Sequence, residues 1–229
     1  MVDEERAETE MGVLRAEGRI FIDRGARTAT VVNPEPLGED ELLHPQLMRA
    51  AAVFAYWDGH EPFHAGAVLG SSGALCLVGG TGAGKSTMLA SLAARGYGVL
   101  TDDLAIISEG WTFAGPRCVD VRPWAAEHIR ARSARPVRNG FRMRIPLQPV
   151  PFRAPVGGWI YLGWSREPEL VPVPAEQRLQ WLVANRMVTH HAKNPAALLD
   201  LAALPAWELR RPRSLEALDS AAELLLDLL

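Results

Sequence analysis

Apolar runs and amphipathic stretches follow one another along most of this chain. The run from Ala74 to Val78 is typical of a buried strand. A glycine-rich bend comes next, and apolar residues then recur at helical spacing from Ser86 to Ala94, where Arg95 and Gly96 form a helix stop. This order of strand, bend and helix predicts a buried sheet with a helix packed on it.

The first 60 residues predict a smaller lobe of the same domain. Strand patterns from Gly18 to Asp23 and from Thr28 to Val32 indicate a hairpin, and apolar positions between Leu42 and Trp57 recur at helical spacing. Residues 1–12 are charged and without period, which is typical of a frayed end. We therefore expect one domain over residues 1–229, with residues 1–60 as a hairpin-and-helix lobe.

The strands around the central helix predict a mixed sheet. A strand expected from Phe63 to Leu69 is joined to the Ala74–Val78 strand by so short a turn that the two must be antiparallel. After the helix, the length of the crossover predicts that a strand from Gly98 to Thr101 returns beside the Ala74–Val78 strand. Later strands are expected over 104–108, 111–113, 141–147, 158–163 and 207–210, and later helices over 123–131, 175–187, 195–204 and from Ser214 onward. The proline-rich stretch 167–174 is expected to be a linker.

The bend after Val78 matches the phosphate-loop pattern G-x-x-x-x-G-K-[ST]. Glycines let such a loop turn its N–H groups inward around an anion, and the helix that follows adds its positive end. Lys85 is one of only two lysines among 24 basic residues, which favours a point-charge role on phosphate. The chain shows no Asn-Lys-x-Asp-like guanine motif, so ATP is expected, with GTP left open. The residues expected to bind the nucleotide are Gly79, Gly80, Thr81, Gly82, Ala83, Gly84, Lys85, Ser86 and Thr87.

Two aspartates and one histidine are the further candidates for catalysis. Asp102 and Asp103 end the strand that follows the central helix, where side chains face the same crevice as the loop. A carboxylate there can hold Mg²⁺ together with Ser86, or it can accept a proton from an attacking hydroxyl. We expect Asp102 to be the metal ligand. The alternative is a pair of turn residues that closes the strand. His64, on the strand expected before the loop, is either a catalytic group near the phosphate or a structural histidine.

A basic segment from Arg117 to Arg144 allows two interpretations. It is either a solvated face or a wall over the crevice that pairs with transferred phosphate or an acidic peptide. Within it, the candidate substrate contacts are Arg122, Arg142 and Arg144. The tryptophans expected in the core rather than against a ligand are Trp111, Trp124, Trp159, Trp164 and Trp181.

Composition excludes several classes of function. The formal net charge of -3 argues against a protein that binds nucleic acid or an anionic membrane surface. Two cysteines far apart in sequence favour a reducing compartment and no zinc site. The acidic start at Asp3, Glu4 and Glu5 does not look like a signal peptide, and no apolar run approaches the length of a membrane span. We therefore expect a cytoplasmic protein.

These motifs together resemble a known family. The sequence HAGAV from His64, the loop GGTGAGKST, the turn Arg95-Gly96-Tyr97 and the closing pair Asp102-Asp103 are similar to the catalytic domain of the HPr serine kinase/phosphorylase family. The similarity is greatest to its short members of the lasso-peptide-kinase type. The close match covers residues 63–107, whereas the family's Glu-Ile-Arg-Gly signature is replaced here by Asp120-Val121-Arg122-Pro123.

The resemblance implies a fold and a mechanism. The fold would be α/β, with a P-loop-containing mixed sheet flanked by helices, as in HPr kinase and PEP carboxykinase. ATP would lie on the loop with Mg²⁺ at Ser86, and Asp103 by preference would take the proton from a serine hydroxyl. His64 would assist near the transferred phosphate, and Lys85 would neutralise developing charge.

We therefore expect a kinase that acts on a serine or another hydroxyl. The acceptor would be a ribosomally made peptide or a small hydroxyl compound, and the family's hexameric habit makes a homo-oligomer an expectation by analogy alone. The alternative is a nucleotide-binding scaffold or sensor that holds nucleotide without transfer and docks a partner through the basic segment.

Overall fold

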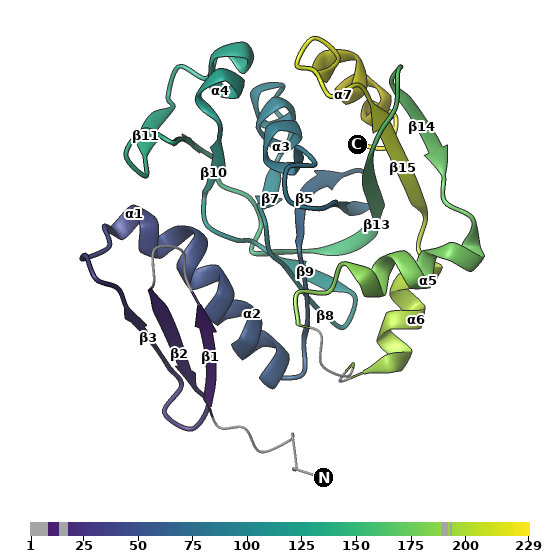
Figure 1. Ribbon diagram of the computed structural model, residues 1–229. Helices are drawn as coiled ribbons and strands as arrows, with labels where there is room; N and C mark the ends of the chain where they lie inside the picture. The colour runs from purple at the N-terminus through teal and green to yellow at the C-terminus, as the bar shows by residue number, and fades with distance from the viewer. Residues whose placement is uncertain (1–8, 14–17, 189–191, 193) are drawn as a thin grey trace.

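A mixed sheet flanked by helices forms the centre of the molecule (Figure 1). The computed structural model describes residues 9–13, 18–188, 192 and 194–229. The strands of this large sheet are β4 (Glu61–Phe63), β5 (Ala65–Gly70), β6 (Gly73–Val78), β7 (Val99–Thr101), β8 (Ala105–Ser108), β9 (Trp111–Phe113), β13 (Arg153–Trp164), β14 (Glu169–Pro172) and β15 (Ala206–Arg211). Their order is β4-β8-β9-β13-β6-β5-β7, with β15 paired to both β13 and β14. The predicted α/β class with a mixed sheet is confirmed.

Helices cover both faces of this sheet. α3 (Lys85–Ala94) and α7 (Leu218–Leu226) lie on one face, and α5 (Ala175–Ala184) and α6 (Pro195–Ala203) lie on the other. Three further helices lie outside these two layers, namely α1 (Glu39–Glu41), α2 (Leu47–Trp57) and α4 (Pro123–Ile129). Along β6, Leu75 and Leu77 pack into the cluster that holds α3 and α7, whereas Cys76 and Val78 pack into the cluster that holds α5 and α6. Successive strand residues point to opposite faces. Because both faces of β6 are buried, its sequence is a continuous apolar run.

The N-terminal lobe packs beside the large sheet. Its antiparallel sheet consists of β1 (Thr9–Val13), β2 (Arg19–Asp23) and β3 (Thr28–Val32). Ile20 and Ile22 of β2 form a small core with Ala50 of α2. The hairpin prediction is confirmed, whereas the expected fraying is wrong for β1, and residues 1–8 lie outside the described residues.

The helix predicted from Leu42 to Trp57 is regular only from Leu47. The backbone between Leu42 and Gln46 is kinked at His44, whose φ of -150° and ψ of 120° are extended. The residue before a proline disfavours the helical region, and Pro45 follows His44. The kink therefore has a local cause that the apolar pattern did not reveal.

Strand order around the loop differs from the prediction. β7 was expected beside β6, but β5 lies between them and is antiparallel to both. The crossover through α3 thus spans one intervening strand. The predicted strand over 63–69 is interrupted at His64, which separates β4 from β5.

Two further predictions need correction towards the C-terminus. Part of the proline-rich stretch is strand β14, which pairs with β15. Its prolines are compatible with an edge position. The last helix begins at Leu218 rather than at Ser214. Within the described residues, no helix combines the length and the apolar character needed to cross a membrane.

A small sheet carries the basic segment. Its antiparallel strands are β10 (Cys118–Val121), β11 (Arg135–Val137) and β12 (Arg142–Pro146), and Asp120 lies opposite Arg144 in the register. This sheet and α4 lie next to α3 and near the N-terminal lobe (Figure 1).

Candidate active site

The phosphate loop joins β6 to α3 in the predicted order. Gly82 and Gly84 have φ angles of 84° and 86°, a left-handed region that residues with a side chain rarely adopt. Gly79 has little room for a side chain, since an added Cβ would lie 2.9 Å from the Cβ of Ala83. The loop therefore requires glycine for steric reasons at residues 79, 82 and 84. It leads into the first amides of α3, which have no partner within the helix and form a site for an anion.

Lys85 is the first residue of α3 and folds back toward the start of the loop. Its Nζ donates to the carbonyl oxygen of Gly79 at 2.7 Å and lies 2.9 Å from Nε2 of His64. Burial lowers the pKa of Lys85, while the charges of Asp103 and Asp102 act in the opposite direction. The ammonium group is thus held at the loop by the Gly79 carbonyl and His64, with the charges of Asp102 and Asp103 nearby.

His64 lies in the break between β4 and β5 rather than within a strand. Its backbone N–H donates to the carbonyl oxygen of Asn185 at 3.0 Å, which fixes the chain at this point. Burial lowers the pKa of His64, and the charge of Lys85 lowers it further. A neutral ring that accepts a hydrogen bond from Lys85 follows from this environment.

Asp102 follows β7 and is buried beside the loop. Its Oδ1 accepts a hydrogen bond from the Ser86 hydroxyl at 3.1 Å, while its buried Oδ2 has no partner among the described residues. Burial raises the pKa of Asp102 well above its ordinary value, and the neighbouring Asp103 raises it further. A divalent cation would supply the missing partner of Oδ2 and favour the ionised form. Ser86 and Asp102 therefore fit a Mg²⁺ site.

Asp103 has the opposite electrostatic environment, although it is the next residue. Its φ of 64° turns the chain sharply, and its Oδ2 lies 3.2 Å from Nε2 of His44. Burial alone would raise the pKa of Asp103, but the hydrogen bond from His44 and the charges of His44, Lys85 and His64 outweigh it and lower the pKa. The carboxylate form, which can accept a proton, is therefore the form favoured at neutral pH.

Sequence analysis did not identify His44. It comes from the N-terminal lobe, and only 8% of its surface is exposed. His44, Asp102 and Asp103 each offer one possible metal-ligand atom, and these three atoms lie within 4.8 Å of one another. No motif surrounds His44 in the sequence. The pre-proline kink was the only local signal, and its significance depends on a contact with a residue far along the chain.

The basic segment divides into buried and cavity-facing arginines. Arg144 forms an ion pair with Asp120, with 2.7 Å between Nε and Oδ1 and with 4% and 1% of the two side chains exposed. It also contacts Asp40 of the N-terminal lobe at 2.7 Å. Arg138 reaches Asp120 at 3.2 Å. Arg144, predicted to contact substrate, is thus engaged within the fold and does not line the main cavity.

Arg122 and Arg142 are placed differently. Their guanidinium carbons lie 4.1 Å and 5.9 Å from the centre of the Phe141 ring, and both line the main cavity. Burial lowers the pKa of Arg142, and the charges of Arg122 and Arg138 lower it further. In the described part of the chain, neither Arg122 nor Arg142 pairs with a carboxylate. Their positive charge is therefore available to an anion in the cavity.

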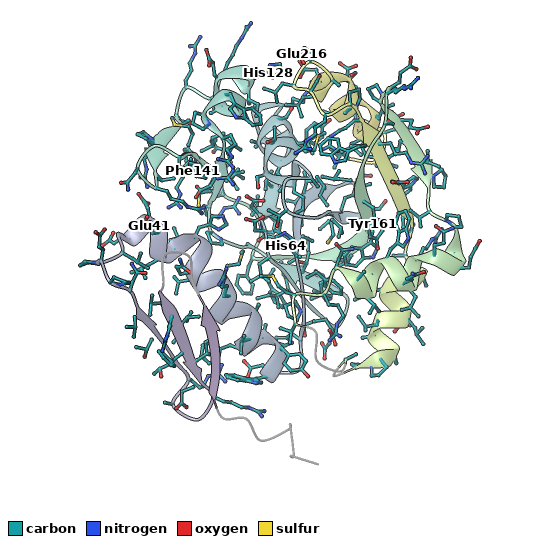
Figure 2. The ribbon with its side chains drawn as sticks, in the orientation of Figure 1. Glu41, His64, His128, Phe141, Tyr161 and Glu216 are labelled. Atoms are coloured by element: carbon teal, nitrogen blue, oxygen red, sulfur yellow. The ribbon has the colours of Figure 1, made fainter. Side chains whose placement is uncertain are left out.

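The main cavity has a volume of about 1240 Å³ and lies between the phosphate loop, the N-terminal lobe and the basic segment. Three of its lining residues, Glu41, His64 and Phe141, are labelled in Figure 2 and come from three different parts of the chain.

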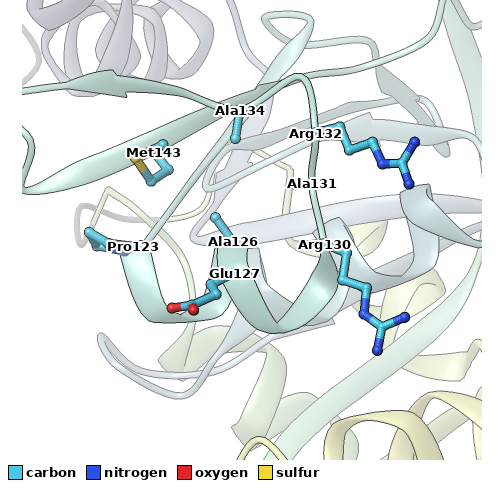
Figure 3. Close-up of a pocket in the computed structure, with 8 residues that line it drawn as sticks. All are labelled: Pro123, Ala126, Glu127, Arg130, Ala131, Arg132, Ala134 and Met143. Carbon is cyan, nitrogen blue, oxygen red and sulfur yellow. The ribbon is translucent and has the colours of Figure 1, made fainter.

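A separate hollow of about 320 Å³ lies along α4 (Figure 3). It is lined by Pro123, Ala126, Glu127, Arg130, Ala131, Arg132, Ala134 and Met143, and by none of the predicted site residues.

The tryptophans are only partly in the core. Trp159 is 1% exposed and Trp181 packs against Tyr161, as predicted. The core prediction is wrong for the other three, because Trp111, Trp124 and Trp164 are 37%, 56% and 45% exposed. Trp124 and Trp164 line the main cavity, so aromatic surface is available there to a ligand.

Comparison with known proteins adds a loose likeness of fold. No protein-family model matches the chain, and no curated protein matches it. Among solved structures, the HPr(Ser) kinase/phosphatase from Coxiella burnetii is similar, with 10% identity over 66% of this chain and 79% of that chain and a TM-score of 0.35. A likeness of this degree does not locate site residues or define an activity. The structure itself defines the class, an α/β protein whose mixed sheet carries a phosphate-loop motif.

Proposed function

We propose that the protein is a Mg²⁺-dependent kinase that transfers the γ-phosphate of ATP to a serine or another hydroxyl group. The observation that carries this proposal is the convergence of two elements on one cavity. Lys85 and Ser86 from α3 and Asp103 after β7 line the same space, and Asp102 is hydrogen-bonded to Ser86. The groups that would bind phosphate and accept a proton thus lie together, as phosphoryl transfer requires.

The nucleotide would bind through the loop. The amides of residues 79–87 and the ammonium of Lys85 would hold the β- and γ-phosphates, and Lys85 would offset the negative charge that develops during transfer. Mg²⁺ held by Ser86 and Asp102 would neutralise charge on the phosphate oxygens. The orphaned Oδ2 of Asp102 is the feature of the structure that supports this ion.

Asp103 would activate the acceptor. Its carboxylate takes the proton of the hydroxyl as that oxygen bonds to the γ-phosphorus, and the bond from phosphorus to the bridging oxygen breaks to release ADP. The lowered pKa keeps Asp103 ionised. The contact with His44 fixes the direction of the carboxylate. His64, which lies beside Lys85, would assist near the phosphate.

The acceptor is proposed to be a ribosomally made peptide or a small hydroxyl compound. The cavity exceeds the usual size of a small-ligand pocket, which leaves room for an acceptor next to a nucleotide. Arg122 and Arg142 would face acidic or phosphorylated groups of that acceptor. The motif resemblance to lasso-peptide kinases favours the peptide.

Co-expression with peptides encoded near this protein tests the proposal. Mass spectrometry should find a phosphate on a hydroxyl side chain of one peptide when the wild-type protein is present. Asp103→Asn provides the matched control, because it keeps the size of the side chain and removes its basicity. Peptides that stay unmodified with wild type, or that are modified equally with Asp103→Asn, would refute the proposed mechanism.

One observation favours a second candidate, a nucleotide-binding sensor without transfer. The lowered pKa of Asp103 weakens it as a proton acceptor, and its Oδ2 is already engaged by His44. In that case the Lys85→Ala variant would lose nucleotide binding, whereas Asp103→Asn would keep all biological activity. Loss of activity in Asp103→Asn with binding retained separates the kinase from the sensor.

A further inference from the structure

Arg211 lies at the phosphate loop, although no motif points to it. It is the last residue of β15, which runs parallel to β13, and β13 runs parallel to β6. The carboxyl ends of these three strands therefore meet at one edge of the sheet, the edge where ligands of open α/β sheets bind. Arg211 also lines the main cavity.

The guanidinium of Arg211 is fixed against the loop by several contacts. Nη2 donates to the carbonyl oxygen of Ala83 in the loop, and Nη1 donates to the carbonyl oxygen of Gly163 on β13 at 3.3 Å. Its central carbon lies 4.6 Å from the centre of the Trp164 ring. An added Cβ on Gly84 would lie 2.7 Å from Nη2, so glycine at this position makes room for Arg211 as well as for the turn.

The bond to Ala83 sets the direction of a loop amide. In a planar trans peptide, the carbonyl and the next N–H point to opposite sides. Holding the Ala83 carbonyl toward Arg211 therefore turns the Gly84 N–H away from it. No acceptor for that N–H is found among the described residues. A free, oriented amide at this point of the loop is what a phosphate oxygen requires.

The charge of Arg211 has no acidic partner in the described part of the chain. Only 5% of its surface is exposed, and burial lowers its pKa to about 10. Arg144 is equally buried, at 4% exposed, but it contacts the carboxylates of Asp120 and Asp40. A buried cation without an anion is costly, and a bound anion would relieve that cost. This contrast between Arg211 and Arg144 within the described residues supports a bound anion as the partner of Arg211.

We propose that Arg211 is a positioning residue of the phosphate site. It holds the Ala83–Gly84 peptide in the orientation that binds an anion and adds a fixed positive charge to the loop. The ligand class that this arrangement selects is a polyphosphate, and the selection increases with the number of phosphates. The inference rests on the nucleotide site proposed above and assigns it a residue from the opposite end of the chain.

Calorimetric titration with ATP, AMP and inorganic tripolyphosphate tests this role. Arg211→Gln should weaken the binding of ATP and tripolyphosphate by about tenfold or more, and that of AMP by less. Arg211→Lys keeps the charge without the forked donor, so it should recover part of the lost affinity. Arg210→Gln is the matched control, since Arg210 precedes Arg211 on β15, forms ion pairs with Glu169 and Glu208, and does not line the main cavity. It should change affinity by less than about twofold.

The outcomes separate this inference from the proposed function. If wild type and Arg211→Gln bind ATP equally well, the role of Arg211 is overturned and the proposed function is not. Wild-type protein that binds neither ATP nor tripolyphosphate overturns both. Thermal unfolding without ligand distinguishes a purely structural role of Arg211 from a role in binding. A purely structural role predicts a lower Tm for Arg211→Gln, and it predicts an equal loss of affinity for all three ligands in the titrations. We expect an unchanged or higher Tm and a loss that follows phosphate number.

Discussion

The Ser86 hydroxyl donates a hydrogen bond to Oδ1 of Asp102 at 3.1 Å. This contact joins the first turn of α3 to the end of β7 and brings the phosphate loop and the aspartate pair into one site. The strands β6 and β7 are not adjacent, because the crossover through α3 spans β5. The contact between Ser86 and Asp102 forms nevertheless. The relationship between loop and carboxylate is thus independent of the strand order that we first expected.

Lys85→Ala should weaken ATP binding by about ten- to a hundredfold, since it removes a charge-assisted contact to phosphate. Fluorescence titration with a labelled ATP analogue measures the change. Because Lys85 is buried and bonded to Gly79, circular dichroism should confirm that the variant is folded. ATP affinity equal to that of wild type would exclude Lys85 from the phosphate site.

His44→Ala should lower the turnover number about tenfold and leave the KM for ATP nearly unchanged. The imidazole contacts the carboxylate of Asp103 and does not belong to the phosphate loop. The loss of one hydrogen bond to a charged group corresponds to a rate change of about this size. His44→Gln, which keeps a hydrogen-bond donor, should restore part of the rate. Steady-state kinetics would contradict this role if KM rose and the turnover number stayed constant.

Opposite pKa shifts of the aspartate pair predict how stability depends on pH. The pKa of Asp102 is raised above 3.8 by burial and by Asp103, so in the ligand-free protein its contribution to stability declines as pH rises through the folded-state pKa. The pKa of Asp103 is lowered, so its stabilising contribution is present above 3.8 and is lost as pH falls through its folded-state pKa.

Asp102→Asn isolates the first of these effects. The variant should have a higher free energy of unfolding than wild type near pH 8, because ionisation of the buried Asp102 carboxyl destabilises the ligand-free wild-type protein. This difference in free energy should shrink toward about pH 4. Urea unfolding at several pH values measures it. The same variant should need more Mg²⁺ for activity, and a stability difference that does not vary with pH would contradict the assigned shift.

Arg144 and Arg142 form a matched pair on β12. Arg144→Leu should lower the free energy of unfolding by about 3–5 kcal/mol, because it leaves the buried charge of Asp120 without its main partner. Arg142→Leu should change stability little, since no ion pair depends on it within the described residues, and it should raise the KM for the acceptor. Urea unfolding and acceptor kinetics on both variants test this division, and equal destabilisation by the two substitutions would contradict it.

Local sequence signals predicted one half of the site and missed the other. The phosphate loop, Lys85, Ser86 and Asp102 lie on consecutive elements, so the pattern of strand, glycine bend, helix and strand was enough to place them together. His44 and Arg211 come from opposite ends of the chain and reach the site only through tertiary packing. Their sequence surroundings carry no motif, and a contact between distant elements leaves no periodic trace in one sequence.

The fold shows the same limit. Alternation and caps predicted α3, β6 and the hairpin of β8 and β9, because these depend on neighbouring residues. The insertion of β5 between β6 and β7 was not predicted, since crossover length alone permits either arrangement. Arg144 illustrates the limit for single residues, because its burial depends on Asp120 and Asp40 from two other segments.

Transfer of labelled phosphate tests the central claim most directly. The protein is incubated with ATP labelled at the γ-phosphate, Mg²⁺ and a library of serine-containing peptides, beside the Asp103→Asn and Lys85→Ala variants. We predict label on a peptide hydroxyl with wild type and none above background with either variant. Label that stays in ATP, or that appears only as inorganic phosphate with every peptide and small alcohol offered, would contradict the assignment of this site as a kinase.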